Sequence, residues 1–413
     1  MTAVTEPGRR IASLDIIRGV AVMGIFSVNV IAFAMIEQAY LNPAMDGGTT
    51  GADLATWLAN NIVIDGKMRS LFSMLFGASM LLVIERAEAS GLDGATIHFR
   101  RMVVLLLFGL AHFYLVWFGD ILALYALVGM IAFFWHAKSA RVLAIWAVTL
   151  FVGSSIFFAT FSAHLMTLDV AAHQVGATAE TIAEWNETVR WGAIPAHEAA
   201  TLETIHRGSF GIRLKYMLDE HLADPFVQLV FIGWETLALM LLGMAAYKAG
   251  FLTGDWDDRR YRKVALAGIG IGGAISIALS LWVWKSGFYL PLVFANFAVA
   301  TPFTHVPMAL GYAALIILLS RDMGPLARRV AAVGRCAFTN YLGTSLIASA
   351  IFYGWGFGQF GHWSRSEAWL LVPVFWLAML AWSKPWLDHF RYGPFEWAWR
   401  SLARGSPQPW RRT

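Results

Sequence analysis

Residues 16–36, IIRGVAVMGIFSVNVIAFAMI, are apolar except for Arg18, Ser27 and Asn29. An α-helix needs about 20 apolar residues to cross a hydrocarbon core about 30 Å thick, and this run has that length. Arg18 interrupts the run and no small-residue cleavage site is apparent. We therefore interpret it as a retained first membrane span and not as a secretory signal peptide.

The composition of the whole chain supports the same class. The 413 residues are 58% hydrophobic and 14% charged, whereas soluble globular domains carry about 25% charged residues. These values exclude disorder and argue against an ordinary soluble enzyme. The strands of a membrane barrel would alternate in polarity over about ten residues, but the apolar runs here are nearly continuous. We predict an all-α, polytopic membrane helical bundle.

Ten apolar runs of helix length follow one another along the chain. They are residues 16–36, 67–84, 102–118, 120–136, 142–161, 226–247, 264–284, 301–320, 336–354 and 367–383. The stretches 52–66 and 288–300 are also apolar, and counting 288–300 as a span gives eleven as the alternative.

The basic residues predict how the spans are oriented. With a cytoplasmic N-terminus and ten spans, 22 of the 31 lysines and arginines fall in cytoplasmic segments, Arg9 and Arg10 among them, and six fall outside. The positive-inside rule then predicts that both termini are cytoplasmic and that the number of spans is even.

Four parts follow from this topology. Residues 1–161 form an N-terminal transmembrane half, and residues 226–384 form a C-terminal one. Residues 162–225 form an acidic extracytoplasmic segment whose charge pattern predicts short amphipathic helices. This segment is either a solvated cap or a lid over an outward-facing site. Residues 385–413 form a basic aromatic tail, which we interpret as an anchor on the anionic inner leaflet.

Ionisable residues inside spans are costly, so each is a candidate functional residue or a structural ion pair. Asp15 and Arg18 are three residues apart and can pair near the inner surface. Asn29 follows Arg18 by eleven residues, and His112 follows Arg101 by the same interval, so each pair shares one helix face. This layout suits an anionic ligand that is held at the inner surface and reaches outward to His112.

Asp120 follows His112 across a turn between two spans. A carboxylate beside an imidazole fixes its tautomer and raises its basicity, as a general base requires. Asp120 could instead cap the start of the next helix, where an acidic residue is favoured. The sequence leaves both roles open.

A second group of charges lies near the predicted outer surface. Asp65 and Arg69 are four residues apart and can pair, while Lys67 faces elsewhere. Glu235 has no cation near it in sequence, so we expect Arg69 or Lys67 as its partner. His305 is expected to be a helix-end histidine wet by solvent.

The ninth span begins at the inner surface with Arg335, Thr339, Asn340 and Tyr341. Arg335 and Thr339 share a face and could bind a phosphate, although Arg335 could also simply follow the positive-inside bias. The lone cysteine, Cys336, excludes an internal disulfide and a multi-cysteine metal site, and we expect it to be buried. We expect no metal and no nucleic-acid partner.

Several stretches together resemble one family. They are residues 13–21 (SLDIIRGVA) with Gly24, Ile25 and Asn29, residues 65–77 (DGKMRSLFSMLFG), residues 119–126 (GDILALYA), Gly334 and Arg335 with residues 339–341, and residues 393–397 (GPFEW). This set is similar to YeiB-like bacterial membrane proteins, whose C-terminal half corresponds to a domain of unknown function.

The resemblance implies membership of a wider transmembrane acyltransferase superfamily that includes heparan-glucosaminide acetyltransferase. Such proteins take an acyl group from cytoplasmic acyl-CoA and pass it to an acceptor across the membrane. Asp15, Arg18 and Gly19 match the shared Asp-x-x-Arg-Gly element. The lysosomal relatives carry a histidine shortly after the residue that matches Asn29, but residues 30–40 contain none. Either acyl transfer is lost here or the base is His112.

We therefore predict an acyltransferase of the bacterial inner membrane that uses acyl-CoA, with acetyl-CoA as the expected donor. Arg18, Arg101 and Arg335 would bind the CoA phosphates at the inner mouth, where only an acyltransferase needs a phosphate-binding cluster. Asn29 would orient the thioester, and His112 with Asp120 would deprotonate a small-molecule, sugar or lipid acceptor. Lys67, Arg69 and Glu235 would shape the acceptor side.

Two other classes stay open. One is a permease or lipid-handling protein that uses the same buried charges, and the other is a structural or sensory protein. Membrane lipid is an expected partner of all three, and a homodimer is one of the assemblies left open.

Overall fold

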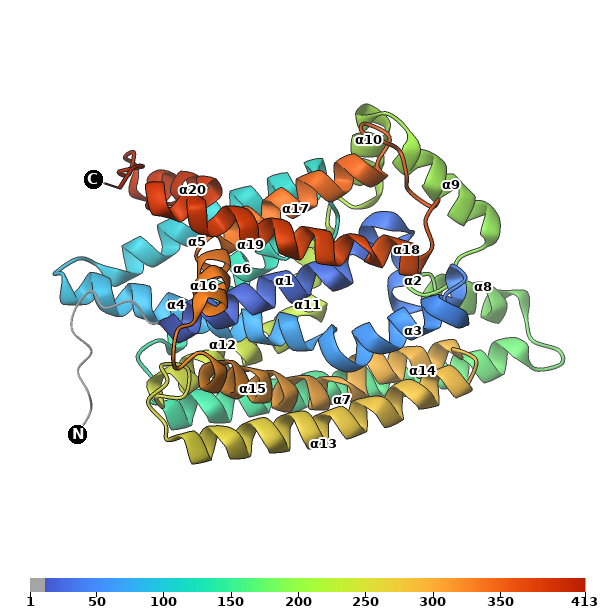
Figure 1. Cartoon of the computed structure of the whole chain (residues 1–413). Helices are drawn as coiled ribbons and strands as arrows, with labels where there is room; N and C mark the ends of the chain where they lie inside the picture. Colours follow the sequence, from blue (N-terminus) through green and yellow to red (C-terminus); the bar gives the residue numbers. More distant parts are fainter. Residues whose placement is uncertain (1–11, 413) are drawn as a thin grey trace.

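The computed structural model describes residues 12–412 as a bundle of helices that run in roughly one direction (Figure 1). The first half contains α1 (Ala12–Ala34), α2 (Glu37–Leu41), α3 (Gly51–Ala59), α4 (Lys67–Ala89), α5 (Gly94–Leu115), α6 (Leu122–Ala132), α7 (Ala140–His173), α8 (Ala179–Thr188), α9 (Ala196–Arg207) and α10 (Phe210–Glu220). The second half contains α11 (Asp224–Phe231), α12 (Gly233–Lys248), α13 (Asp258–Lys285), α14 (Leu290–Ala295), α15 (Pro302–Leu319), α16 (Pro325–Arg335), α17 (Ala337–Phe352), α18 (Arg365–Trp369), α19 (Leu371–His389) and α20 (Pro394–Arg404).

Each of the ten predicted runs coincides with helical structure. Within residues 12–412, seven helical stretches are long and apolar enough to cross a membrane, and an eighth is added if the bent pair α11 and α12 counts as one. α6 and α17 are shorter apolar helices, as is the stretch 290–300 that made an eleventh span an alternative. The chain is an all-helical, multi-pass membrane protein.

α1 forms the centre of the bundle. Of the most apolar stretch of α1, 72% is buried, compared with 22% for α7 and 28% for α13. α7 and α13 expose apolar side chains on the outside of the bundle. α16 packs so closely on α1 that a Cβ atom on Gly334 would lie 1.8 Å from the carbonyl oxygen of Asp15. The Gly-Arg pair at 334–335 therefore marks a helix crossing, and Cys336 is buried beside it as predicted.

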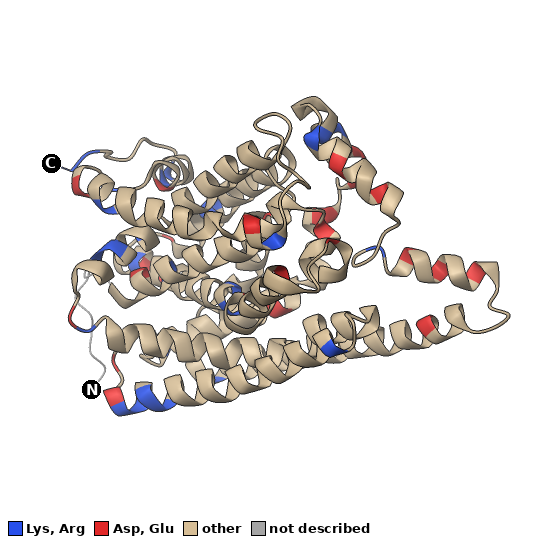
Figure 2. Ribbon diagram, turned by 45° about the vertical axis from the view of Figure 1, so that its right-hand side comes forward, with Lys and Arg blue, Asp and Glu red and all other residues tan. Residues whose placement is uncertain are grey.

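The charges separate along the bundle axis. Figure 2 shows Lys and Arg gathered at the end that holds α20 and the start of α13, while Asp and Glu dominate the helices at the opposite end. This separation agrees with the positive-inside prediction. Arg9 and Arg10, which contributed to that prediction, lie outside the described residues.

Several helices begin inside the bundle, which the sequence did not indicate. The predicted span 226–247 is not continuous, because α11 and α12 meet at an angle of 64° around Ile232. α4 begins after Gly66, which has a φ of +70° and follows a π-helical segment, Asn60–Ile64. A second π-helical segment, Asn296–Ala300, precedes α15. Such interruptions within apolar helices often occur at functional sites.

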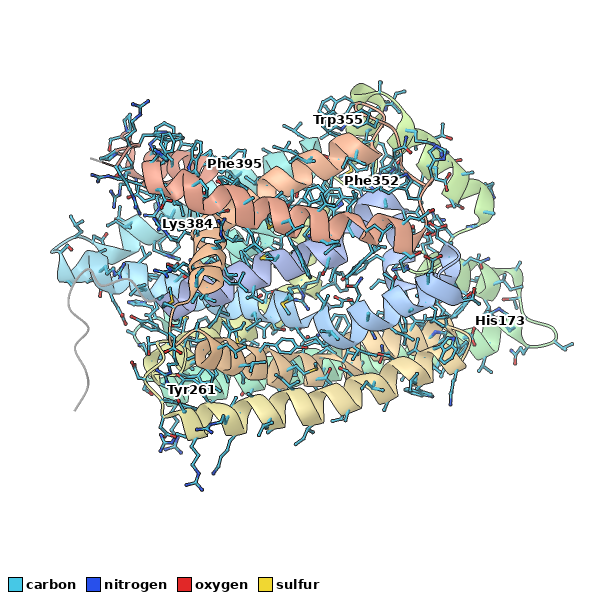
Figure 3. All side chains as sticks on the ribbon, viewed as in Figure 1. His173, Tyr261, Phe352, Trp355, Lys384 and Phe395 are labelled. Atoms are coloured by element: carbon cyan, nitrogen blue, oxygen red, sulfur yellow. The ribbon has the colours of Figure 1, made fainter. Side chains whose placement is uncertain are left out.

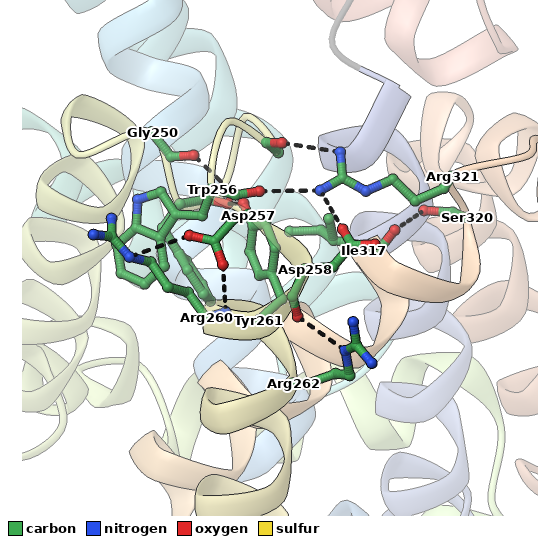
Figure 4. Close-up of polar contacts among 12 residues, drawn as sticks. Gly250, Trp256, Asp257, Asp258, Arg260, Tyr261, Arg262, Ile317, Ser320 and Arg321 are labelled. Carbon is green, nitrogen blue, oxygen red and sulfur yellow. Dashed lines mark hydrogen bonds and ion pairs between the residues drawn. The ribbon is translucent and has the colours of Figure 1, made fainter.

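The two ends of the bundle are closed differently. At the basic end, Arg321 after α15 donates to the carbonyls of Gly254 and Trp256 and pairs with Asp258 at 3.0 Å, which holds α13 and α15 together (Figure 4). At the acidic end, α7 continues unbroken to His173, eleven residues beyond the predicted start of the cap. Short helices follow, as predicted for an amphipathic segment.

The C-terminal tail packs onto the bundle. α20 contacts α5 and α17, and Figure 3 shows its Phe395 at the same end as Lys384 of α19, far from His173 of α7. The tail is therefore part of the folded structure, and its role as an anchor stays a prediction.

Candidate active site

His112 and Asp120 form a buried pair. The Nδ1 atom of His112 lies 2.8 Å from Oδ1 of Asp120, and their side chains are 2% and 1% exposed. Oδ2 of Asp120 accepts a hydrogen bond of 2.8 Å from the backbone N–H of Ala123 at the start of α6. The two roles left open by the sequence are thus combined, because one carboxylate orients the imidazole and caps the helix.

The second nitrogen of this imidazole is unused. Nε2 of His112 is buried and has no hydrogen-bond partner in the part of the chain that the structure describes. A histidine with Nδ1 fixed by a carboxylate and Nε2 open is arranged to accept a proton from a bound molecule. Without a bound molecule, Nε2 is a buried polar atom that makes no hydrogen bond, which is rare in folded proteins.

Aromatic rings hold this imidazole in place. The ring of Tyr341 on α17 lies 5.4 Å from that of His112, and its hydroxyl accepts a hydrogen bond from the backbone N–H of Ile121. Trp117 stacks on Phe33 of α1, with 4.2 Å between ring centroids. Tyr341 therefore belongs to the surroundings of His112 and not to a phosphate site at the inner surface.

Asn29 lies on α1, four residues before Phe33. Its side chain makes no hydrogen bond among residues 12–412, and it keeps part of its surface accessible although Val28 and Val30 are buried. Arg18 and Ile25 are also partly accessible, and the three share one helix face by spacing. The structure shows no direct contact between Asn29 and His112.

A second ion pair lies between α4 and α12, with side chains that are 27% and 14% exposed. Arg69 Nη2 and Glu235 Oε2 are 2.8 Å apart, which confirms the predicted partner of Glu235. Because α12 begins at Gly233, Glu235 occupies the first turn of that helix, where a carboxylate is favoured. Arg69 Nη1 and Glu235 Oε1 are buried without partners among the described residues.

The predicted pairing of Asp65 with Arg69 is wrong. Asp65 accepts a hydrogen bond of 2.9 Å from the hydroxyl of Tyr40 instead. Lys67 is fully buried and donates to the carbonyl oxygen of Asn61 in the first π-helical segment. The π-helical turn supplies this acceptor because it brings the Asn61 carbonyl back toward the start of α4.

His305 is also placed differently from the prediction. It is buried, and its Nδ1 has no hydrogen-bond partner in residues 12–412, so it is not wet by solvent. Its ring lies where a side chain on Gly66 would be, since a Cβ atom there would come within 1.9 Å of it. Gly66 is therefore required both by its positive φ and by this close approach.

Tyr125 of α6 connects these groups to the first pair. Its hydroxyl lies 2.6 Å from Ser73 Oγ on α4, and its surroundings include Arg69, Glu235 and Tyr341. The starts of α4, α6, α12 and α15 thus contribute Lys67 and Arg69, Asp120, Glu235 and His305 to one polar layer. The sequence identified these residues but not the helix breaks that bring them together.

Of the residues predicted to form a phosphate site at the inner mouth, Arg18 has its predicted partner and several others do not. Arg18 pairs with Asp15 at 3.2 Å, as predicted, and donates to Ser79 of α4 at 2.7 Å. Thr339, however, donates its hydroxyl hydrogen to Glu396 of α20. The same carboxylate accepts the N–H groups of Phe338 and Thr339.

The start of α17 is therefore occupied by Glu396, and the expectation that Thr339 offers a phosphate donor is wrong. Burial raises the pKa of Glu396, while these hydrogen bonds oppose that rise. Asn340 has a structural role, because it donates to the carbonyl of Val333 and accepts from the indole N–H of Trp382. Arg335 lies partly exposed at the end of α16.

Arg101 has different neighbours from those expected. Its guanidinium lies 4.1 Å from the ring centroid of Trp399 on α20, and the indole N–H of Trp399 donates to the Arg101 carbonyl. The charges of Arg400 and Arg404 act on Arg101 from the same helix. The basic cluster at this end is formed by α5 and α20, and the i,i+4 spacing of Arg400 and Arg404 was its sequence signal.

An aromatic seam leads from this basic cluster to His112. Phe338 lies 5.8 Å from Trp399 and 5.4 Å from Phe108, measured between ring centroids. One turn further out, Tyr341 meets His112. His112 is eleven residues beyond Arg101, or about 16 Å along α5. This distance is comparable with an extended phosphopantetheine arm.

The cap contributes residues that the sequence analysis did not single out. Arg213 of α10 is 1% exposed and donates to the carbonyl of Val116, one turn beyond His112. Beside it, burial lowers the pKa of His206 to about 4. No spacing pattern relates these residues to α5, since 97 residues separate Arg213 from Val116.

An open groove of about 880 Å³ lies further out in the cap. Asp169 and His173 at the end of α7, Trp185 of α8, Arg190 after α8 and Tyr289 before α14 contribute to its lining. Within residues 12–412, no three His, Cys, Asp or Glu side chains converge as metal ligands would.

Comparison with known proteins identifies the family. Residues 246–406 match the family described as "Protein of unknown function (DUF418)". The chain is 32% identical to "Uncharacterized protein YeiB" of Escherichia coli (strain K12), over 97% of this chain and 98% of YeiB. It is 31% identical to "Uncharacterized protein YxaH" of Bacillus subtilis (strain 168), over 98% and 97%. No solved structure matches the chain. The protein belongs to the YeiB-like family of uncharacterized membrane proteins that carry the DUF418 domain.

Proposed function

We propose that this protein is a membrane acyltransferase that moves an acyl group from cytoplasmic acyl-CoA to an extracytoplasmic hydroxyl or amine. The observation that carries the proposal is the buried His112–Asp120 pair with its open Nε2. A carrier would need charges along its pathway, but it has no need of an imidazole held in one tautomer. The resemblance of Asp15, Arg18 and Gly19 to the acyltransferase superfamily supports the same conclusion.

In the proposed reaction, Nε2 of His112 takes the proton of the acceptor while the acceptor oxygen or nitrogen bonds to the thioester carbon. The carbon–sulfur bond then breaks, and the CoA sulfur leaves with the proton that His112 had taken. Asp120 stabilises the intermediate imidazolium. Asn29 is the candidate donor to the carbonyl oxygen, a contribution that is typically about 3–4 kcal/mol.

The donor side of the proposal is changed by the structure. We assign the CoA phosphates to Arg101, Arg400 and Arg404, with the thioester arm along the aromatic seam. Arg18 is a candidate contact at the same inner surface. We also propose that the chain has ten spans, with both termini in the cytoplasm, and that it lies in the bacterial inner membrane.

Thermal melting of the detergent-purified protein with acetyl-CoA, free CoA and longer acyl-CoAs tests the donor site. A ligand at about 100 times its Kd adds about 2.7 kcal/mol to the free energy of unfolding. We expect acyl-CoA to raise the melting temperature of the wild type and to lose most of this effect in Arg101→Gln and in Arg404→Gln.

Arg404 is exposed, so its replacement leaves the fold intact. Arg259→Gln is the matched control, because Arg259 is exposed at the same end of the bundle but lies on α13. Absence of any shift with every CoA species contradicts an acyl-CoA-dependent enzyme.

A permease is the second candidate, and one observation favours it. α4, α12 and α15 begin inside the bundle, and interrupted helices with charged residues at their starts also line substrate sites of transporters. If no CoA compound binds, uptake assays in proteoliposomes with Arg69→Gln as the inactive variant are the test of this alternative.

A further inference from the structure

Arg213 places a buried cation at the outer end of α5. Its side chain belongs to α10 and is 1% exposed. Nη2 donates a hydrogen bond of 2.8 Å to the carbonyl oxygen of Val116, and the guanidinium carbon lies 4.6 Å from the ring centroid of Tyr353. These contacts fix the position of the charge.

The charge itself is not neutralised in residues 12–412. Nε and Nη1 of Arg213 are buried without hydrogen-bond partners, and so is the hydroxyl of Tyr353 beside them. Asp219, on the same helix, pairs with Lys215 instead. A buried charge without a counter-ion costs several kcal/mol. One helix-end carbonyl uses only one of the five N–H groups of an arginine.

The position of this cation relates it to the candidate base. Val116 follows His112 by four residues, so the guanidinium lies roughly one helical turn, about 6 Å along α5, beyond the imidazole. α10 also exposes Phe210, Ile212 and Leu218, and Leu222 follows in the next loop, each more than 40% accessible. Exposed apolar residues on an otherwise polar helix favour a position in the membrane interface, at the depth of lipid headgroups.

We infer that Arg213 and the Tyr353 hydroxyl bind a phosphate group of the acceptor, whose free hydroxyl two or three carbons away reaches His112. The inference rests on the proposed function and narrows its acceptor to a hydroxyl-bearing phosphate ester. Arginine suits this ligand because its planar donors can contact two phosphate oxygens at once. Phosphatidylglycerol of the membrane and soluble glycerol 3-phosphate both have this chemistry.

Binding is tested without turnover, by melting of the purified full-length protein. The probes are phosphatidylglycerol, phosphatidylcholine, which has no free hydroxyl and no net charge, and sn-glycerol 3-phosphate. We expect phosphatidylglycerol or glycerol 3-phosphate to stabilise the wild type more than phosphatidylcholine does. The affinity should fall about tenfold in Arg213→Gln and in Tyr353→Phe, which loses only the hydroxyl.

His112→Gln is the control that separates the two proposals. It should retain phosphate-ester binding, and it should do so even if His112 proves not to be the base. Stabilisation by phosphatidylglycerol alone identifies a lipid acceptor, and stabilisation by glycerol 3-phosphate as well shows that the headgroup suffices. If both probes act no better than phosphatidylcholine, or if Tyr353→Phe and Arg213→Gln keep wild-type affinity, the inference is wrong.

Discussion

At the scale of single residues, Asp120 links folding to the proposed chemistry. One of its oxygens holds His112 and the other caps α6 through the N–H of Ala123. The hydrogen bond that caps α6 fixes the carboxylate of Asp120, and this carboxylate fixes the imidazole of His112. A change at this one position therefore affects both the free energy of unfolding and the proposed reaction, and conservative variants can separate the two effects.

Asp120→Asn should separate them. Asparagine caps helices as well as aspartate does, so the free energy of unfolding should change by less than about 1 kcal/mol. The neutral amide cannot stabilise the imidazolium, so acyl transfer should fall about 100-fold or more. The measurement pairs a melting curve with transfer of labelled acyl groups.

Asp93→Asn is the matched control for that variant. Asp93 caps α5 through the N–H groups of Ala95 and Thr96 but has no histidine beside it. This variant should leave transfer unchanged. Equal transfer rates in Asp120→Asn and the wild type would contradict the role of the carboxylate.

At the scale of elements, the helix breaks and the cap determine the site. Arg69 lies near both Glu235 and His305 because α4, α12 and α15 begin within the bundle. The loop that joins α10 to α11 is one of the points at which the cap contacts the bundle, because the hydroxyl of Tyr114 on α5 donates to the carbonyl of Leu222. There His221 contacts Asp224 at 2.7 Å and Tyr216 at 3.0 Å, close to Glu37 of α2.

This contact predicts a pH dependence of stability. Burial alone would lower the pKa of His221, but the hydrogen bond that it donates to Asp224 and the charges of Glu37, Asp224 and Glu220 outweigh it and raise the pKa. The protonated form is therefore favoured in the folded state. Its stabilisation is complete below the unfolded pKa of about 6.5 and is lost as pH rises through the folded pKa.

Glu37 changes stability in the same direction. Burial raises its pKa, which favours the neutral carboxyl in the folded state, so stability falls as pH rises above the ordinary pKa of about 4.3. We expect the melting temperature to decrease between about pH 6 and pH 8. His221→Gln should flatten this decrease, and His197→Gln, at an exposed histidine of α9, should not. A wild-type curve that rises over this range would contradict the assignment.

At the scale of the whole molecule, much of the architecture could be predicted from the sequence. Each of the ten apolar runs coincides with helical structure, although only seven or eight stretches of residues 12–412 are long and apolar enough to cross a membrane. The lysines and arginines gather at one end of the bundle. Pairs close in sequence, such as Asp15 with Arg18 and His112 with Asp120, were also predicted correctly. These features depend on helix geometry and local composition alone.

The features that could not be predicted depend on contacts between segments that are distant in sequence. Glu396 is 57 residues from Thr339, so spacing along α17 could not show that this threonine is already bonded. The bend between α11 and α12 has no proline or charge at Ile232 to mark it. Arg213 was one of several cations in an acidic segment, and only its tertiary burial distinguishes it.

The orientation of the bundle is a further prediction at this scale. In a Cys336→Ala background, Val175→Cys and Leu92→Cys place single thiols at the two ends, since these residues are 106% and 57% exposed. A membrane-impermeant maleimide should label position 175 in intact spheroplasts and position 92 only after permeabilisation. The reverse pattern would contradict the proposed topology.

Acyl transfer with His112 as the base is tested in membrane vesicles that contain the protein. Labelled acetyl-CoA is supplied on the cytoplasmic side, and the incorporation of the label into acceptors is measured. We expect transfer by the wild type and a loss of about 100-fold or more in His112→Gln, while that variant still binds acetyl-CoA. Transfer at the wild-type rate in His112→Gln, or no transfer by the wild type with acyl-CoAs of any chain length, would contradict it.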